Sequence, residues 1–345
     1  AVIKAVDEYQ DLLRLSVATA GNDHRLGANE APPAIISMFI GDDLSAVLES
    51  IVNDSPYNQK DKTVIKVGVN MLPHFFKDTT DRNRTSPFAF TGNKFEFRMP
   101  GSSLSIAGPN FVLNTIVAEA LSQFADALEK APDFTSALDE LIKSTISEHK
   151  RIIFNGNNYS EDWVKEAEKR GLLNLKTTVD AMPYFISEKN ISLFKKHGIL
   201  TESEIRSRYE IMLDGYCKTL NIEALTMLEM IKRNIIPSAC AYIGDLSETA
   251  IRKKEVLPDV SCAVEKSLIE KLSSLTEILY KKTEKLELDL LGTKDFDDIA
   301  KQSAYYKEVV LLSMQELRAV ADELEPLVGE KYWPFPTYSE LLFNI

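Results

Sequence analysis

Two long amphipathic segments late in the chain constrain its fold most. Residues 260–291 and 296–327 carry apolar stripes with charged residues between them, for example Leu268, Leu272 and Leu275. Steps of three and four residues place such side chains on one face of an α-helix, and that face must pack against another surface. The two segments are predicted to pair as an antiparallel helical hairpin. The second half of the chain is therefore predicted to be helical.

The first half mixes helices with short strands. Residues 1–17, 34–52 and 109–128 have the pattern of helices, and residues 63–76 alternate as a strand does. The first helix has no preceding Ser, Thr, Asp or Asn to cap it, so the chain is expected to begin inside a helix. This order predicts an α+β fold that is predominantly helical.

Composition excludes some classes of partner. The 345 residues are 44% hydrophobic, which is enough for one large domain or two average ones. The formal net charge is −12 and the pI is about 5.0, whereas nucleic-acid binding needs clustered Lys and Arg. No nucleic-acid partner is expected.

The cysteines and the apolar runs indicate a soluble, cytoplasmic chain. Cys217, Cys240 and Cys262 are odd in number and lack the close spacing of a zinc site, so reduced thiols are expected. The longest apolar runs, such as 234–243, stop well before the roughly 18 residues that a membrane span needs. No membrane partner is expected, and neither a P-loop nor a G-x-G-x-x-G motif occurs.

The segment KFEFR at 94–98 is the first candidate for chemistry. The two-residue period of a strand places Phe95 and Phe97 on one face and Lys94, Glu96 and Arg98 on the other. Two cations then flank one carboxylate. The pattern alone favours a half-buried edge strand with an ordinary ladder of ion pairs, and a functional site is the alternative that the neighbouring residues support.

Further charged residues lie upstream of this segment. Arg25 and Glu30 sit in a loop of small residues, and the run DRNR at 81–84 ends in Arg84. Several arginines with scattered carboxylates suit a substrate that bears both phosphate and carboxylate groups, because guanidinium binds such oxyanions in a bidentate way. Magnesium prefers oxygen ligands, so Glu96 is a candidate for one of them.

These stretches resemble a known family. RLGANEAPP at 25–33 resembles the substrate loop of glutamine synthetases, and NRTSPFAFTGNKFEFRMPGSS at 83–103 resembles their nucleotide and metal strand. The type III members in particular also look like EAEKRGL at 166–172 and YWPFPTY at 332–338. The resemblance runs over the whole chain and is to the C-terminal half of that family's proteins.

The resemblance implies roles at the glutamate side of an active site. Arg25 and Arg98 are similar to arginines that bind the glutamate substrate. Glu30 looks like the flap glutamate that closes the site and helps to deprotonate ammonium.

The resemblance also implies roles at the nucleotide and metal side of the active site. Arg84 resembles the arginine placed against the transferring phosphoryl group and the nucleotide, and Lys94 stands where many members have an arginine that touches nucleotide. Glu96 is similar to the last carboxylate ligand of the second metal ion. The implied cofactors are ATP and Mg²⁺ or Mn²⁺.

The activity implied by the resemblance is the ATP-dependent ligation of ammonia to glutamate in nitrogen metabolism. ATP phosphorylates the side-chain carboxylate, and ammonia displaces phosphate from the γ-glutamyl phosphate. Residues 1–235 are expected to be the C-terminal part of the catalytic domain, and residues 236–345 a helical type III extension with the long hairpin. Family members assemble as stacked rings, so a homo-oligomer is expected.

The chain also departs from the family. Ala89 replaces a phosphate-side arginine of the common bacterial class, and the spacing between Ile51 and Asp81 indicates an insertion. Most metal ligands of the family lie upstream of the flap loop, so the isolated chain is expected to be inactive. The four histidines, at 24, 74, 149 and 197, are expected to be surface or packing residues.

Two other hypotheses stay open. The chain is alternatively a non-catalytic helical oligomerisation module or fragment, or an amine ligase of the same superfamily with another acceptor. Magnesium-dependent ATP binding and the choice of amine separate these possibilities.

Overall fold

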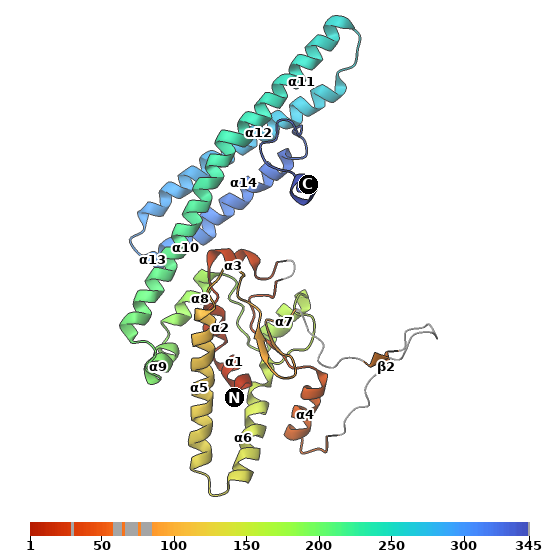
Figure 1. The fold of residues 1–345 in the computed structure, drawn as a ribbon. Coiled ribbons are helices and arrows are strands. Elements are labelled where there is room, and N and C mark those ends of the chain that lie inside the picture. Colours follow the sequence, from red (N-terminus) through yellow and green to blue (C-terminus); the bar gives the residue numbers. More distant parts are fainter. Residues whose placement is uncertain (29–30, 58–63, 66–74, 77–84, 344–345) are drawn as a thin grey trace. The chain divides into compact units, whose positions relative to one another are not determined.

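The structure is a computed structural model that describes residues 1–28, 31–57, 64–65, 75–76 and 85–343 (Figure 1). Glu30 and Arg84 lie outside the described residues. Helices predominate among the described residues, with one small three-stranded sheet, so the predicted predominantly helical α+β fold is confirmed. The chain divides into two compact units, residues 1–212 and 213–345.

Helices form most of the first unit. Their bounds are α1 (Val2–Glu8), α2 (Gln10–Leu15), α3 (Ala20–Arg25), α4 (Asp42–Val52), α5 (Ala107–Glu129), α6 (Phe134–His149), α7 (Glu161–Lys169), α8 (Thr178–Phe185), α9 (Glu188–Lys196) and α10 (Glu202–Met230). As predicted, no side chain caps the first helix. Ser160 caps α7, and Thr201 with Glu204 forms a capping box at the start of α10.

The sheet has the order β1 (Met38–Phe39), β4 (Phe88–Phe90) and β5 (Phe95–Phe97). β1 runs parallel to β4, and β4 runs antiparallel to β5. A separate pair, β2 (Val64–Ile65) and β3 (Phe75–Phe76), is antiparallel and lies within the segment predicted as a strand.

The expected helix over residues 34–52 was wrong in its first part. Residues 34–40 are buried and include β1, and the helix begins only at Asp42. A run of Ile, Met and Phe suits a strand that is covered on both faces. Gly41, with a φ of 81°, then turns the chain into α4.

A buried arginine joins three helices in this unit. Arg14 in α2 is 1% exposed; its Nε donates to the Leu175 carbonyl at 2.8 Å and its Nη2 to Asp23 Oδ1 at 3.0 Å. Asp23 in α3 accepts from the Thr178 amide at the start of α8, at 2.6 Å. Burial lowers the pKa of Arg14 and raises the pKa of Asp23, while the attraction between the two groups opposes both shifts.

A second buried network joins the start of the unit to the end of α6. Asp7 is 3% exposed and binds His149 Nδ1 at 2.8 Å and Arg151 Nε at 2.8 Å. Arg151 belongs to a short 3₁₀ turn, Lys150–Ile152, that follows α6. His149 is therefore a packing residue, as the sequence predicted.

Helix α5 is the one helix among the described residues that is long and apolar enough to cross a membrane by length and composition. It packs against α1, α2, α6 and α9, and it runs beside α6 in Figure 1. Glu119 of α5 is 6% exposed and binds Lys196 Nζ at 2.8 Å and His197 Nε2 at 2.7 Å. Carboxylates are almost never fully buried unless they are paired, and Glu119 follows this rule.

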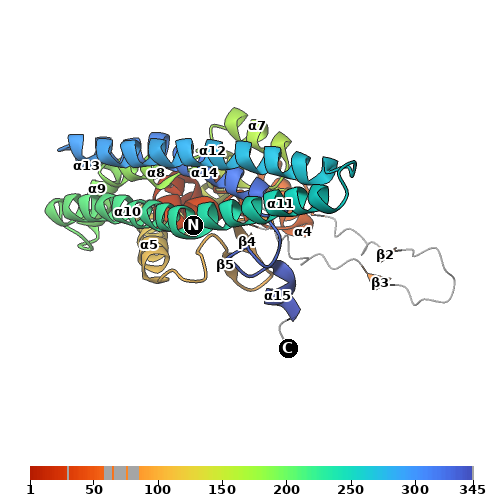
Figure 2. The same cartoon turned by 90° about the horizontal axis from the view of Figure 1, so that it is seen from above.

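Long helices form the second unit. After the shared helix α10 come a π-helical turn (Ile231–Ile235), α11 (Ile236–Val256), α12 (Ala263–Gly292), a 3₁₀ turn (Thr293–Asp295), α13 (Ile299–Tyr305), a second π-helical turn (Tyr306–Val310), α14 (Leu311–Leu324) and α15 (Tyr338–Phe343). α12 packs against both α11 and α14, and Figures 1 and 2 show α11 and α12 side by side. The predicted domain boundary at 235 falls at the end of the first π-helical turn, and it stays a prediction.

The tail after α14 packs on α11. The rings of Tyr242 and Tyr332 lie 5.1 Å apart, and the Tyr332 hydroxyl donates to Asp245. Tyr332 thus attaches the tail segment to α11.

Replacing Glu119 with Gln is expected to destabilise the first unit and to change its acid response. Burial opposes ionisation, but hydrogen bonds from Lys196, Gln123 and His197 outweigh it and lower the pKa of Glu119 to about 2. The folded pKa is below the unfolded value, so this stabilisation is complete above about pH 4.5 and is lost as the pH falls toward 2. We expect Glu119→Gln to cost about 2 kcal/mol, which lowers the melting temperature by about 4–8 °C.

The measurement is thermal unfolding followed between pH 7 and pH 2. Glu202→Gln is the control, because its ion pair with Arg206 is exposed and spans one helical turn. Equal melting temperatures for wild type and Glu119→Gln would contradict the prediction.

Candidate functional site

Strand β5 presents a charged face. Arg98 donates through Nη2 and Nε to Glu96 Oε2, at 2.9 and 3.2 Å, and Lys94 Nζ lies 3.3 Å from Glu96 Oε1. Phe95 and Phe97 contact the ring of Phe88 in β4, with centroids 5.7 and 5.9 Å apart. The predicted alternation of the two faces is therefore confirmed, and the charged side chains lie together.

The electrostatics of this face favour an ionised carboxylate. The hydrogen bond from Arg98 lowers the pKa of Glu96, and Lys94 adds to the effect. The side chains of Glu96 and Arg98 are 25% and 19% exposed, and that of Lys94 is 63% exposed. The face is partly open to solvent, so its cations can reach an anionic ligand.

The opposite strand offers little bulk beside Glu96. Ala89 of β4 pairs directly with Glu96 and is fully buried. The position where the family resemblance implies an arginine is thus occupied by a buried alanine of the sheet. Because Ala89 has no charge, Lys94, Glu96 and Arg98 supply the charge of this face.

Arg25 is held against the end of β5. Its Nη1 donates to the Met99 carbonyl at 2.8 Å and to Asn22 Oδ1 at 3.0 Å, and its Nη2 lies 3.4 Å from the Arg98 carbonyl. The structure therefore brings Arg25 together with the segment that carries Lys94, Glu96 and Arg98. These contacts use three of the five N–H donors of a guanidinium.

A backbone hydrogen bond links the two described sides of the loop after α3. The Gly27 amide donates to the Pro32 carbonyl at 2.9 Å, and Gly27 has a φ of 77°, which favours glycine. The predicted roles of Glu30 and Arg84 fall on residues outside the described ranges and stay predictions.

The described residues do not by themselves fit a divalent cation. Across the described ranges, no group of three or more His, Cys, Asp and Glu side chains is placed to hold a metal ion. Both oxygens of Glu96 already face cations, Arg98 and Lys94. A magnesium ion usually takes one or two carboxylates together with water and phosphate oxygens, so Glu96 offers one ligand.

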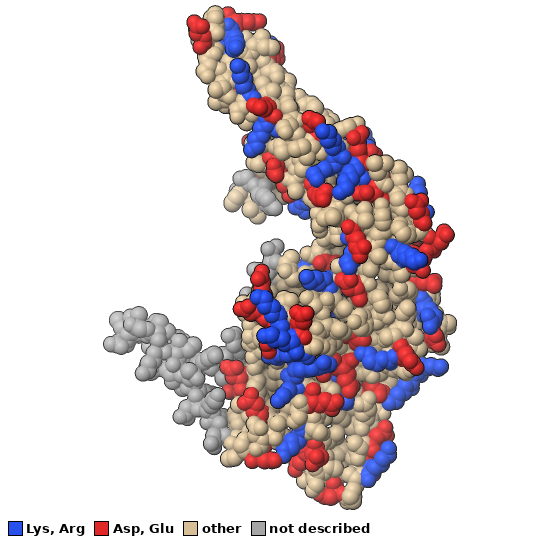
Figure 3. Space-filling view, turned by 180° about the vertical axis from the view of Figure 1, so that it is seen from behind, with Lys and Arg blue, Asp and Glu red and all other residues tan. Residues whose placement is uncertain are grey.

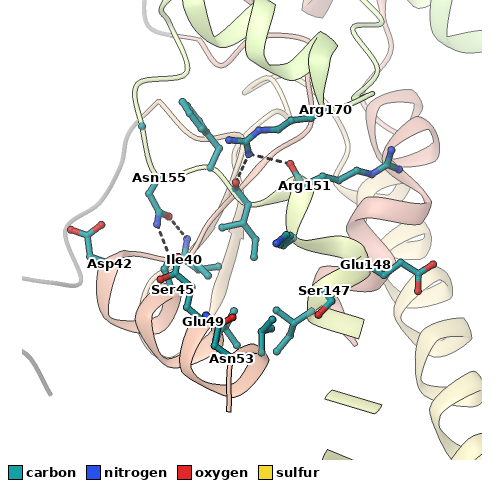
Figure 4. A pocket seen from close by; sticks show the side chains of 17 residues that line it. Ile40, Asp42, Ser45, Glu49, Asn53, Ser147, Glu148, Arg151, Asn155 and Arg170 are labelled. Atoms are coloured by element: carbon teal, nitrogen blue, oxygen red, sulfur yellow. Dashed lines mark hydrogen bonds between the residues drawn. The ribbon is translucent and has the colours of Figure 1, made fainter. Parts of the chain in front are cut away.

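The sequence interpretation missed a pocket of about 930 Å³ between α4 and the end of α6 (Figure 4). Ile40, Leu48, Val52 and Ile153 are among its apolar lining residues. None of the predicted site residues that the structure describes lines it. No motif marks the pocket in the sequence, because its lining comes from segments about a hundred residues apart.

Hydrogen bonds within the protein occupy the main polar groups of this pocket. Asn155 Oδ1 accepts from the amides of Ile40 and Gly41, both at 3.1 Å, and so holds the two residues that precede α4. Arg170 Nη1 donates to the Ile153 carbonyl at 2.8 Å, and its guanidinium lies 5.6 Å from the centre of the Trp163 ring. These side chains therefore support the pocket wall rather than project into it.

Charges of both signs are mixed on the molecular surface. In the view of Figure 3, Lys and Arg side chains alternate with Asp and Glu side chains over the described part of that face. Many of them form exposed pairs four residues apart on helices, such as Glu202 with Arg206 and Glu277 with Lys281. Such pairs belong to solvated helix faces.

Comparisons with known proteins agree with the resemblance in the sequence. Residues 137–254 match the family described as glutamine synthetase C-terminal domain. The chain is 45% identical over 354 residues to the glutamine synthetase of Butyrivibrio fibrisolvens, covering 100% of this chain and 49% of that protein. It is 41% identical over 355 residues to the type-3 glutamine synthetase of Dictyostelium discoideum, covering 99% of this chain and 48% of that protein.

A third relative matches this chain over the same share of its own length. The chain is 36% identical over 358 residues to the glutamine synthetase of Bacteroides fragilis strain YCH46, covering 99% of this chain and 49% of that protein. The chain therefore spans about half the length of the relatives it matches.

Replacing Asn155 with Ala is expected to loosen the start of α4 and the pocket wall. The substitution removes the acceptor of two backbone amides, and each lost hydrogen bond costs about 0.5–1.5 kcal/mol. Hydrogen exchange should then be faster at the amides of Ile40 and Gly41. Asn155→Asp keeps an acceptor at the same place and is the matched control. Unchanged exchange at Ile40 and Gly41 in Asn155→Ala would show that these two hydrogen bonds contribute nothing.

Proposed function

We infer that this chain forms part of an ATP-dependent ligase that joins ammonia to glutamate. The chain belongs to the glutamine synthetase family and is similar to its type III members. Glutamine synthetases are ligases of nitrogen metabolism. The chain spans about half of its relatives, so the activity is proposed for the protein expressed from its full coding sequence.

One observation supports the proposal most. The segment KFEFR carries a carboxylate between two cations on one strand face, and Arg25 from α3 is hydrogen-bonded to the end of that strand. Three cationic side chains thus come from two segments more than 60 residues apart. Glutamate and ATP both carry oxyanions that such cations bind.

The residues of this chain would bind and orient the two substrates. We propose that Arg25 and Arg98 hold the carboxylate of glutamate and that Lys94 contacts the nucleotide. Arg84 would face the transferring phosphoryl group. Holding the two reactants in line supplies much of the catalysis in phosphoryl transfer.

Glu30 and Glu96 have different proposed tasks. Glu30 would close the site, exclude water that otherwise hydrolyses an acyl phosphate, and take a proton from ammonium. Glu96 would supply one carboxylate to Mg²⁺ or Mn²⁺ bound with the nucleotide, the other ligands coming from outside the described residues. A cytoplasmic homo-oligomer of stacked rings is the expected setting.

Replacing Glu96 with Ala tests the proposed function. The assay is γ-glutamyl transfer with glutamate, ATP and hydroxylamine at increasing Mg²⁺, on the protein expressed from its full coding sequence. We expect the wild type to be active, and Glu96→Ala to need at least about 10–100-fold more Mg²⁺ or to lose activity, since this is the usual cost of a lost partner at a metal site.

Glu210→Ala is the matched control, because Glu210 is an exposed glutamate in α10 of the same unit. It should behave as the wild type does. Equal activity of Glu96→Ala and Glu210→Ala at ordinary Mg²⁺ would sink the role of Glu96. No transfer and no Mg²⁺-dependent ATP binding by the wild type would favour the oligomerisation module instead. Phosphate release from ATP with another amine as acceptor, but not with ammonia, would favour a different amine ligase.

A further inference from the structure

The polar residue Asn22 lies at the centre of the contact between α3 and the end of β5. It is 3% exposed. Its Nδ2 donates to the Val17 carbonyl at 2.9 Å and to the Met99 carbonyl at 3.1 Å. Its Oδ1 accepts from Arg25 Nη1 at 3.0 Å.

These partners define the orientation of the amide group. An asparagine amide has two N–H donors, and both are used on carbonyl oxygens. A flipped amide would place its oxygen against two carbonyls and its NH₂ group against the guanidinium of Arg25. Both contacts would be repulsive, so only one orientation satisfies the surroundings.

The same contacts fix the backbone beside Arg98. The Arg98 amide donates to the Pro87 carbonyl at 2.8 Å, and the Met99 carbonyl accepts from both Asn22 and Arg25. Met99 itself is fully buried. The chain at Arg98 is therefore held by β4 on one side and by α3 on the other.

The helix that carries Asn22 is itself well anchored. Thr19 caps α3 by accepting from the Asn22 amide at 3.2 Å. The next residue, Asp23, is bound to Arg14 and to the Thr178 amide. Asn22 thus sits on a fixed support, which suits a residue that holds others in place.

We propose that Asn22 is a positioning residue that sets the guanidinium of Arg25 relative to Arg98, and so the affinity for the dicarboxylate substrate. This inference rests on the proposed function, in which Arg25 and Arg98 bind glutamate. Without Asn22, Arg25 Nη1 loses one of its two acceptors, and the Met99 carbonyl loses one of its two donors. Arg25 then samples several orientations, and glutamate must restrict them on binding.

A kinetic comparison separates positioning from general loss of stability. Asn190 is the matched control: it is fully buried, and its Nδ2 donates to Asp11 Oδ2 at 3.0 Å and to the Tyr184 carbonyl at 2.7 Å. Asn22→Ala and Asn190→Ala should lower the melting temperature by similar amounts. Only Asn22→Ala should raise the KM for glutamate, by about tenfold, with the KM for ATP unchanged within about twofold.

Two kinetic results would overturn the proposal. One is an equal rise of the KM for glutamate in Asn22→Ala and Asn190→Ala. The other is a rise of both KM values together in Asn22→Ala, because a general loosening of the site affects both substrates.

A second measurement does not depend on any enzymatic activity. Phenylglyoxal reacts with guanidine groups that it can reach, and in the wild type Arg25 Nη1 is bound to Asn22 Oδ1 and to the Met99 carbonyl. Peptide mass spectrometry should show faster modification of Arg25 in Asn22→Ala than in the wild type or in Asn190→Ala. The exposed Arg206 serves as the internal reference.

The two measurements distinguish a failure of the proposal from a failure of the proposed function. Faster modification of Arg25 in a protein whose wild type shows no γ-glutamyl transfer keeps the positioning role and rejects the ligase. Equal modification of Arg25 in the wild type and in Asn22→Ala rejects the positioning role, whatever the activity.

Discussion

The guanidinium of Arg14 is the contact on which much of the first unit depends. It is 1% exposed and binds the Leu175 and Lys176 carbonyls and Asp23. A buried cation is stable only when hydrogen bonds and an opposite charge replace its water, and removal of one partner is costly. The ion pair therefore requires α2, α3 and the start of α8 to keep one arrangement. The short helix α3, with six residues, has too few contacts of its own to be stable and takes its position from this pair.

The position of α3 decides what the charged strand can do. Asn22 and Arg25 lie on that helix and bind the Met99 carbonyl, at the end of the segment that carries Glu96 and Arg98. An edge strand with ion pairs is common and carries little information about function. Arg25 of α3 adds a cationic side chain at the end of this strand, and this distinguishes the strand from one with an ordinary ladder of ion pairs. A site for a dicarboxylate and a nucleotide needs such convergence, because each oxyanion needs its own donors at a set distance.

Apolar packing between long helices stabilises the second unit. α12 packs its stripe of Leu272, Leu279 and Leu286, which are fully buried, between α11 and α14. Its stability comes from apolar faces that recur along long helices. Its exposed charges pair both along single helices, as Glu277 does with Lys281, and between helices, as Lys285 does with Glu316. Helix α10 begins in the first unit and ends in the second, so the two units share one continuous element.

Local periodicity by itself determined most of the helices, the alternation of β5 and the capping of α7 and α10, because each depends on residues close in the sequence. The runs at 25–33 and 83–103 also supported the family resemblance and the candidate residues. The tertiary structure alone decided that residues 34–40 are a buried, non-helical segment that includes the strand Met38–Phe39, since a run of Ile, Met and Phe is compatible with a helix until its partner strand is known. It alone joined Asn22 to Met99, 77 residues away, and built the pocket at Asn155. Such contacts depend on how segments that are distant in the sequence pack together, and a local sequence pattern carries no information about that packing.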